Sequence, residues 1–453
     1  MSIVQKLAIK QGYPKRRTTI KRKLLKNQLL HSLNSNYLNL EEPYNATYGV
    51  KELQIFFHAL VTEHASANLA LDTVYDKFGY NLADQQTVKE RCEKTGVEVM
   101  EKQLNKMLIV NALKLPTYDS DYKLAKVKKW NTERRRKTTE RRENNRGRDD
   151  EVPRLRQRER NIDPPQGRYL SMDFTLKPFY PKSFEYYNEN DLPLAEYLTR
   201  DRRKRSTTKF LGYHTVYDHE LGSRQILGVH MLRNVRRPKY KHGWKREGLD
   251  YVVQYLLDPI LEKLSVQGLT ADGDYFNKAV VIYLESKELD YIIRANKDDN
   301  VREIIENNDL NEILMDGEGF EVEAGQSLGS GKKAVPTRLV IVKRGEELVP
   351  LILPSYSELT PEQALLVYEE RFGIETAYRE VYNYLPRTSS ISPEYRLALY
   401  AMTCWFFNIL LNYYQIVVIF SAQPTDWHTS LSRLKNQIEG IFGDLLRRVV
   451  DQS

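Results

Sequence analysis

The sequence predicts an α/β protein in which a mixed β-sheet with flanking helices follows an all-α N-terminal region. The chain has 453 residues, which is more than one ordinary hydrophobic core holds, so two or three domains are expected. Its hydrophobic content of 41% and aromatic content of 11% favour a folded chain over a disordered one. The apolar spacing is helical before residue 120 and becomes strand-like after residue 165.

Residues 1–120 are predicted to be helical. Apolar residues recur at three- and four-residue steps through 66–79 and 83–95, and glycines at positions 79 and 96 mark the ends of these two helices. Two short helices followed by a third resemble a helix-turn-helix arrangement, which would make this region a DNA-binding unit. Any small helical bundle would give the same pattern, so both interpretations remain open.

Two strongly basic segments flank this helical region. The net charge of the chain is only +8, yet residues 1–26 contain nine Lys and Arg and no acid. Residues 121–165 form a basic linker with too few apolar residues to fold alone, and it includes an arginine-rich run. Such segments indicate a polyanionic partner, DNA or RNA, through Arg134, Arg135, Arg136, Arg141 and Arg142. The alternative is a solvated charge run that serves solubility.

Residues 166–420 are predicted to form the α/β domain. Amphipathic helices are expected at 249–264, with Pro259 as a kink, and at 277–287. The predicted elements follow one another as strands, helix, strand, helix and strand, which is the order found in a ribonuclease H-like mixed sheet. The expected strands are 168–175, 209–217, 225–232, a short one ending at Asp272, and 291–295.

The second half of this domain carries three further predictions. Residues 318–353 suggest a small β-rich insertion made of hairpins around Gly345. A long helix is expected from Thr360 to about Tyr384, with Glu362 completing a capping box. Residues 397–420 are long and apolar enough to span a bilayer, but regularly spaced polar residues favour a buried helix. A helical tail is expected at 421–453.

Three acids stand out because they lie on separate predicted elements. Asp173 lies in the middle of a strand, and Asp272 ends a strand directly before a tight turn. Glu375 lies on the long helix, on one face with Tyr368 and Arg371. Two strand-borne aspartates and a glutamate from a crossing helix can meet at one point, and carboxylates suit Mg²⁺ or Mn²⁺. Each acid taken singly has a simpler interpretation, as a turn residue, a cap or a surface ion pair.

The sequence around these acids resembles a known family. Tyr368, Arg371 and Glu375 match the first three positions of the Y-(2)-R-(3)-E-(6)-K signature of insertion-sequence DDE transposases, and the string from Arg371 to Arg379 is similar to their archaeal branch. Asp272 is followed three and four residues later by Tyr and Phe, as in the second motif of that family. Residues 169–175 resemble its first-strand motif.

Two positions depart from the pattern of the family. Its signature lysine is replaced by Tyr382, which carries no charge, and Arg379 is a possible substitute. The second motif usually has glycine where this chain has Asp274, so Asp274 competes with Asp272 for the metal-ligand assignment. The aromatic spacing favours Asp272.

The resemblance implies a transposase that holds two Mg²⁺ or Mn²⁺ ions with Asp173, Asp272 and Glu375. It further implies that Tyr368, Arg371, Arg379 and Tyr382 contact DNA, and that a homodimer binds the terminal inverted repeats of the element and the target DNA. The sequence shows no signal peptide and two distant cysteines, so a cytoplasmic, non-membrane protein is expected. A catalytically inactive DNA-binding derivative and a ribonuclease H-like nuclease without strand transfer remain alternatives.

Overall fold

The structure is a computed structural model, and it describes most of residues 82–420 with a few segments before them. The described residues are 38–40, 50–63, 71–72, 75–76, 82–113, 167–180, 194–204, 207–218, 225–236, 244–296, 299–322 and 336–420. The predicted basic linker with Arg134, Arg135, Arg136, Arg141 and Arg142 lies outside these residues. So do the predicted tail 421–453 and the whole of the basic N-terminal segment 1–26.

The described part of the N-terminal region contains three helices, while most of the helix predicted at 66–79 lies outside the described residues. It contains α3 (Val50–Glu63), α5 (Gln85–Thr95) and α6 (Val97–Leu113). The carboxylate of Asp84 caps α5 by accepting a hydrogen bond from the Thr87 amide at 2.7 Å. Gly96 ends α5 with a φ of +76°, a left-handed value that favours glycine, and α6 starts at the next residue.

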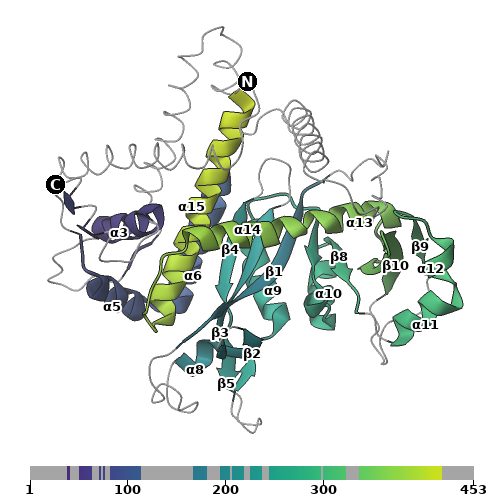
Figure 1. Ribbon diagram of the computed structural model, residues 1–453, viewed down its shortest axis with the longest axis horizontal. Coiled ribbons are helices and arrows are strands. Elements are labelled where there is room, and N and C mark those ends of the chain that lie inside the picture. The colour runs from purple at the N-terminus through teal and green to yellow at the C-terminus, as the bar shows by residue number, and fades with distance from the viewer. Residues whose placement is uncertain are drawn as a thin grey trace, which may run out of the picture.

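A nine-stranded mixed sheet forms the centre of the molecule (Figure 1). Its order is β2-β3-β1-β7-β8-β11-β10-β9, and β4 pairs with β3 beside this path. The central strand β1 is antiparallel to β3 and parallel to β7, so the predicted α/β class with a mixed sheet is confirmed. The strands are β1 (Tyr169–Pro178), β2 (Leu198–Lys204), β3 (Thr207–Asp218), β4 (Ile226–Met231), β7 (Gly268–Ala271), β8 (Asp290–Arg294), β9 (Gly319–Glu321), β10 (Thr337–Arg344) and β11 (Glu347–Pro354); β5 (Asn234–Arg236) and β6 (Trp244–Arg246) form a separate pair.

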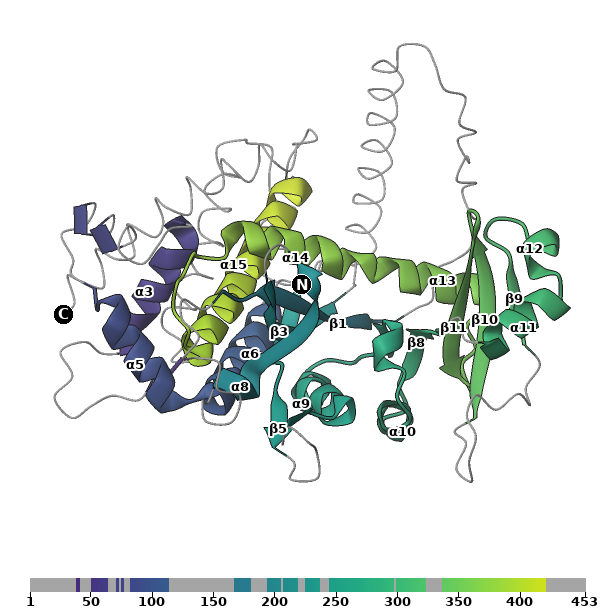
Figure 2. The same ribbon diagram turned by 60° about the horizontal axis from the view of Figure 1, so that its bottom comes forward.

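Helices cover both faces of the sheet (Figure 2). On one face, α9 (Leu249–Leu261) and α10 (Lys278–Ser286) share a buried core with Leu170 and Met172 of β1. On the other face, α14 (Phe372–Tyr384) and α15 (Pro393–Phe420) share a core with Tyr213 of β3 and with the N-terminal helices. The shorter helices are α8 (Leu194–Tyr197), the 3₁₀ turn η2 (Gly273–Tyr275), α11 (Asp299–Asn307), α12 (Leu310–Ile313) and α13 (Pro361–Glu370).

The hairpins predicted at 318–353 continue the main sheet. Strand β11 pairs antiparallel with β8, where Ile352 lies opposite Ile293, and β10 and β9 follow outward. Residues 323–335, which belong to the predicted β-rich insertion, lie outside the described residues.

The prediction of one long helix from Thr360 is wrong in one respect, because this segment forms two helices that meet at Arg371. The amide of Arg371 donates to the carbonyl of Tyr368, and the amide of Ile374 donates to the carbonyl of Arg371, so a tighter turn replaces the α-helical pattern. The capping box at Thr360 uses Gln363 instead of Glu362, since Gln363 is the third helical residue. Glu362 accepts from the amide of Gly319 at 3.0 Å and thereby ties α13 to β9.

Helix α15 is a core element. Its residues from Leu397 to Leu410 are buried, and Tyr400 stacks on Tyr213 of β3 with ring centroids 4.1 Å apart. Among the helices of the described residues, none combines the length and the apolarity that crossing a membrane requires.

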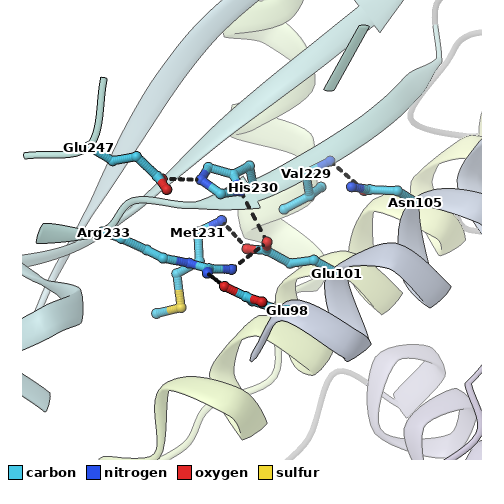
Figure 3. Close-up of polar contacts among 8 residues, drawn as sticks. All are labelled: Glu98, Glu101, Asn105, Val229, His230, Met231, Arg233 and Glu247. Carbon is cyan, nitrogen blue, oxygen red and sulfur yellow. Dashed lines mark hydrogen bonds and ion pairs between the residues drawn. The ribbon is translucent and has the colours of Figure 1, made fainter. Parts of the chain in front are cut away.

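The edge of β4 that faces away from β3 is covered by side chains of α6, shown in Figure 3, and by Asn408 of α15. The Glu101 carboxylate accepts from the Met231 amide at 2.6 Å, and Asn105 accepts from the Val229 amide at 2.8 Å. Residues four apart on a helix are separated by about 6 Å along its axis. Alternate residues of a strand are separated by about 6.8 Å. Glu101 and Asn105 therefore match two successive outward amides of the edge strand, and Asn408 of α15 binds both backbone groups of Ile226.

Glu101 is also the centre of a buried ionic cluster, defined here as Glu98, Glu101, His230, Arg233 and Glu247. One Glu101 oxygen accepts from Arg233 at 2.7 Å and lies 3.0 Å from Nδ1 of His230. The second ring nitrogen of His230 lies 2.7 Å from Glu247, and Arg233 also contacts Glu98 at 2.8 Å. Because Glu101 belongs to α6 and His230 to β4, the ionic cluster joins the N-terminal helices to the sheet.

The ionic cluster predicts a pH-dependent stability. Burial lowers the pKa of His230, but Glu101 and then Glu247 outweigh it and raise the pKa to about 9. A group whose pKa is raised on folding stabilises the fold fully below its unfolded pKa, which is 6.5 here, and loses that contribution as the pH rises through about 9.

We therefore expect the melting temperature of the full chain to fall between pH 6.5 and 9 by more than that of His230→Gln, which cannot take up the proton. Thermal unfolding of both proteins across this range measures the difference. Parallel curves would contradict a charged His230 in the folded state.

Candidate active site

The first acid, Asp173, lies on β1 with its side chain on the α14 face of the sheet. Its neighbour Met172 is fully buried in the opposite core, and strand alternation turns Asp173 the other way. The carboxylate is only 15% exposed, and Oδ1 accepts a hydrogen bond from the Phe174 amide at 2.8 Å. In the sheet register Asp173 lies opposite Thr215 of β3.

The second acid, Asp272, lies directly after β7. Strand β7 runs parallel to β1, and Ala271 is paired with Met172. The next residue after each of them is an aspartate, so Asp272 and Asp173 lie next to each other on neighbouring strands. Asp272 caps η2 by accepting from the Gly273 amide at 2.8 Å. A side chain at Gly273 would come within 3.1 Å of the Arg294 carbonyl, so the turn passes close to β8. Asp274 is exposed on the turn.

The third acid, Glu375, lies in the first turn of α14 and is bridged to Asp173 by Arg371. The guanidinium of Arg371 lies 3.5 Å from Oδ2 of Asp173 and 3.9 Å from Oε1 of Glu375. Arg371 is buried and lies over the rings of Tyr368 and Phe372, with its Cζ atom 5.1 and 5.2 Å from their centroids. Its Nε has no hydrogen-bond partner in the described part of the chain.

The three carboxylates act on one another electrostatically. Burial raises the pKa of Asp173 to about 6, while Arg371 and the Phe174 amide oppose the rise, and Asp272 and Glu375 add to it. Burial lowers the pKa of Arg371, but Tyr368, Asp173 and Asp272 more than compensate, so its pKa is raised and it stays charged. Arg371 is thus the buried countercharge of an acidic site.

Hydroxyl groups fix α14 on the strands that carry this site. The hydroxyl of Tyr378 is hydrogen-bonded to Thr215 of β3, and that of Tyr382 to Thr175 of β1. The ammonium of Lys177, also on β1, lies 2.8 Å from the centroid of the Tyr382 ring. These contacts join residues more than 160 positions apart, so no local sequence pattern indicates them.

The aromatic residue after Asp272 is anchored below the site. The hydroxyl of Tyr275 lies 2.7 Å from Nδ1 of His214 on β3, and both side chains are buried. Burial, followed by His230 and Arg246, lowers the pKa of His214 to about 3, so the imidazole is neutral. The bond ties the turn of Asp272 to the strand next to β1. His214 was not among the predicted site residues, because a lone histidine in an apolar strand gives no signal.

The structure brings four of the predicted site residues together: Asp173, Asp272, Arg371 and Glu375. Tyr368 is buried beneath Arg371, and the hydroxyl of Tyr382 is directed to Thr175. Arg379 is exposed on α14, one turn after Glu375.

The acids suit a divalent cation by the chemistry of their donors. Three carboxylates supply the hard oxygen ligands that Mg²⁺ and Mn²⁺ prefer. In the described residues no group of three or more His, Cys, Asp or Glu side chains is arranged so that it could hold a metal ion as it stands. Arg371 lies between Asp173 and Glu375 in this structure.

Comparison with known proteins finds a family model that is similar to part of the chain. Residues 214–394 match the family model described as the transposase DDE domain. The match contains Asp272 and Glu375, whereas Asp173 precedes it. No curated protein matches the sequence. Among solved structures, the chain is similar to the cryo-EM structure of the piggyBac transposase synaptic complex with hairpin DNA. That similarity has 11% identity and a TM-score of 0.46, and covers 96% of this chain and 73% of the other.

Proposed function

We propose that this protein is a transposase that cleaves DNA at the ends of an insertion sequence and joins them to target DNA. The observation that carries the proposal is that Arg371 lies between Asp173 of β1 and Glu375 of α14, while Asp272 follows the neighbouring strand β7 and acts on the pKa of Asp173. The match of residues 214–394 to the transposase DDE domain supports it.

Asp173, Asp272 and Glu375 would hold two divalent ions, Mg²⁺ or Mn²⁺. When bound, such a pair of metals activates the attacking oxygen and stabilises the leaving oxygen of an in-line phosphoryl displacement. Asp272 is preferred to Asp274 as a ligand, because Asp272 acts on the pKa of Asp173 while Asp274 is exposed on the turn. The burial of Asp173 keeps water away from one side of the site.

Arg371 supplies the fixed positive charge of the site. In this arrangement its guanidinium offsets the charge of Asp173 and Glu375. It lies beside the carboxylates that would hold the metals, and bidentate guanidinium contacts to phosphate are among the strongest hydrogen bonds in proteins.

The partners follow from the same reaction. We infer that double-stranded DNA binds as terminal inverted repeats and as target, and that a homodimer holds two ends together. Arg379, exposed on α14, and the arginine-rich linker would contact phosphate, while the N-terminal helices would recognise the repeats. The protein would act in the cytoplasm of a prokaryotic cell, next to the nucleoid.

The test is incubation of the full chain with labelled duplex DNA that carries the ends of its own element, in Mg²⁺ or Mn²⁺. Cleavage at the ends together with strand-transfer products is the expected result. Cleavage without joining would instead identify a nuclease of ribonuclease H-like fold. Binding without cleavage would identify an inactive DNA-binding derivative, the alternative suggested by Tyr382 in place of lysine.

A further inference from the structure

Asp173 and Asp272 are held in place by different means. Asp173 lies inside β1, and the sheet register pairs it with Thr215 of β3. The pairing of β7 with β1 ends one residue before Asp272, where Ala271 lies opposite Met172. Asp272 is the first residue of the turn η2, so contacts of that turn, and not strand pairing, set its distance from Asp173.

The turn is closed by its own hydrogen bonds. Oδ1 of Asp272 accepts from the Gly273 amide at 2.8 Å, and the Asp272 carbonyl accepts from the Tyr275 amide at 2.9 Å. Because the second bond joins the two ends of the turn, a movement of Tyr275 is passed on to Asp272. The anchoring of the Tyr275 side chain therefore bears on where the carboxylate lies.

The side chain of Tyr275 is anchored two strands away. Its hydroxyl lies 2.7 Å from Nδ1 of His214 on β3, and the two rings meet edge to face at 83°. The strand order is β3-β1-β7, so this side chain crosses the width of β1. His214 lies opposite Phe174 in the register, which puts the bond on the sheet face away from Asp173. The exposed fractions are 0% for Tyr275 and 2% for His214, so the bond is shielded from solvent.

We propose that His214, acting through Tyr275, is a positioning residue that holds Asp272 where it can share a cation with Asp173. The inference rests on the proposed function for the cation. Metal ligands must be held to within about 0.5 Å of their productive geometry, so an indirect contact of this kind has a measurable effect. A buried polar pair can also serve stability alone, and metal affinity separates the two roles.

The test measures Mn²⁺ binding by the full chain on a duplex that carries the element's ends, followed by electron paramagnetic resonance. The Mn²⁺ that is lost in Asp272→Asn defines the ions held at the acids and removes the contribution of the DNA. Outer partners of metal ligands typically contribute about 10- to 100-fold to metal affinity. We expect a weakening of this size in Tyr275→Phe, which keeps the ring, and in His214→Leu.

Rescue by a conservative variant and a matched control complete the experiment. Asparagine resembles leucine in shape but offers a donor and an acceptor, so we expect His214→Asn to bind Mn²⁺ nearly as wild type does. Tyr169→Phe removes another buried hydroxyl, which donates to Asp290 at 3.1 Å at the start of β1. We expect that variant to melt at a lower temperature with unchanged Mn²⁺ binding. Melting temperatures confirm that each variant is folded in the assay.

Three results would overturn the inference. They are an unchanged Mn²⁺ affinity in Tyr275→Phe, an equal loss in Tyr169→Phe, and equal losses in the two His214 variants. The same Mn²⁺ binding by wild type and Asp272→Asn would instead overturn the role of Asp272 in the proposed function, which keeps the two failures distinguishable.

Discussion

Replacing any one of Asp173, Asp272 or Glu375 with its amide is expected to abolish metal-dependent cleavage while DNA binding persists. Each amide keeps the shape of the side chain and removes the charge that would hold a cation. A bound metal contributes several kcal/mol of transition-state stabilisation. A loss of about 4 kcal/mol corresponds to a thousandfold in rate, so we expect reductions of at least about that size. Single-turnover cleavage of labelled ends in Mg²⁺ and Mn²⁺ measures the effect.

Asp274→Asn is the matched control for this series. It lies two residues from Asp272 in the same turn but is exposed, and we expect cleavage at close to the wild-type rate. Metal binding by the cleavage-deficient variants, followed through the electron paramagnetic resonance of Mn²⁺, gives a readout that does not depend on activity. Full cleavage by Asp272→Asn together with its loss in Asp274→Asn would transfer the role to Asp274.

Glu101→Ala is expected to lower the free energy of unfolding by about 3–5 kcal/mol, the range for breaking a buried ion pair from one side. Glu101 is fully buried. Its carboxylate accepts a hydrogen bond from the Met231 amide and contacts the side chains of Arg233 and His230. Removing it takes one of two carboxylate partners from each of two buried cations and leaves the Met231 amide without its acceptor, which costs more than the loss of one contact alone. Urea unfolding of the full chain, followed by tryptophan fluorescence, measures the change.

Glu98→Ala provides the comparison on the same helix. Glu98 binds the same arginine at 2.8 Å, but its side chain is 68% exposed, so solvent weakens the pair. We expect a change below about 1 kcal/mol, as for other exposed ion pairs. Similar costs for the two substitutions would mean that burial does not decide the strength of this ionic cluster.

Local patterns were sufficient to predict most of the elements. The helix ending at Gly96 was predicted because a glycine commonly marks a helix end, and the structure gives Gly96 a positive φ. The start of the helix predicted at 277–287 is confirmed by Asn277, whose side chain caps it. The strands of Asp173 and Asp272 were found because alternating or continuous apolar residues surround the acids. The break at Arg371 was missed, because the residues on both sides of it are ordinary helix formers and only hydrogen bonds of the folded chain reveal the tight turn.

Long-range contacts account for the rest. Pairing of β11 with β8 depends on matching backbone edges that are nearly 60 residues apart, and no pattern within either strand specifies it. The three acids of the candidate site were predicted because family-like strings flank each of them. Lys177 and Thr215, which lie beside that site, have no such string, and their partners on α14 lie far along the chain.

Because α6 covers the edge of β4, its sequence limits which helices could replace the N-terminal helices of this chain during evolution. A helix that replaces α6 must carry a carboxylate and an amide one turn apart, at the places of Glu101 and Asn105, or two strand amides lose their acceptors. Swapping the N-terminal helices between distant relatives would therefore disturb the sheet that carries Asp173, through β4 and β3. In the proposed function, changes in DNA preference are expected to arise by substitution within these helices while the residues that meet β4 are kept.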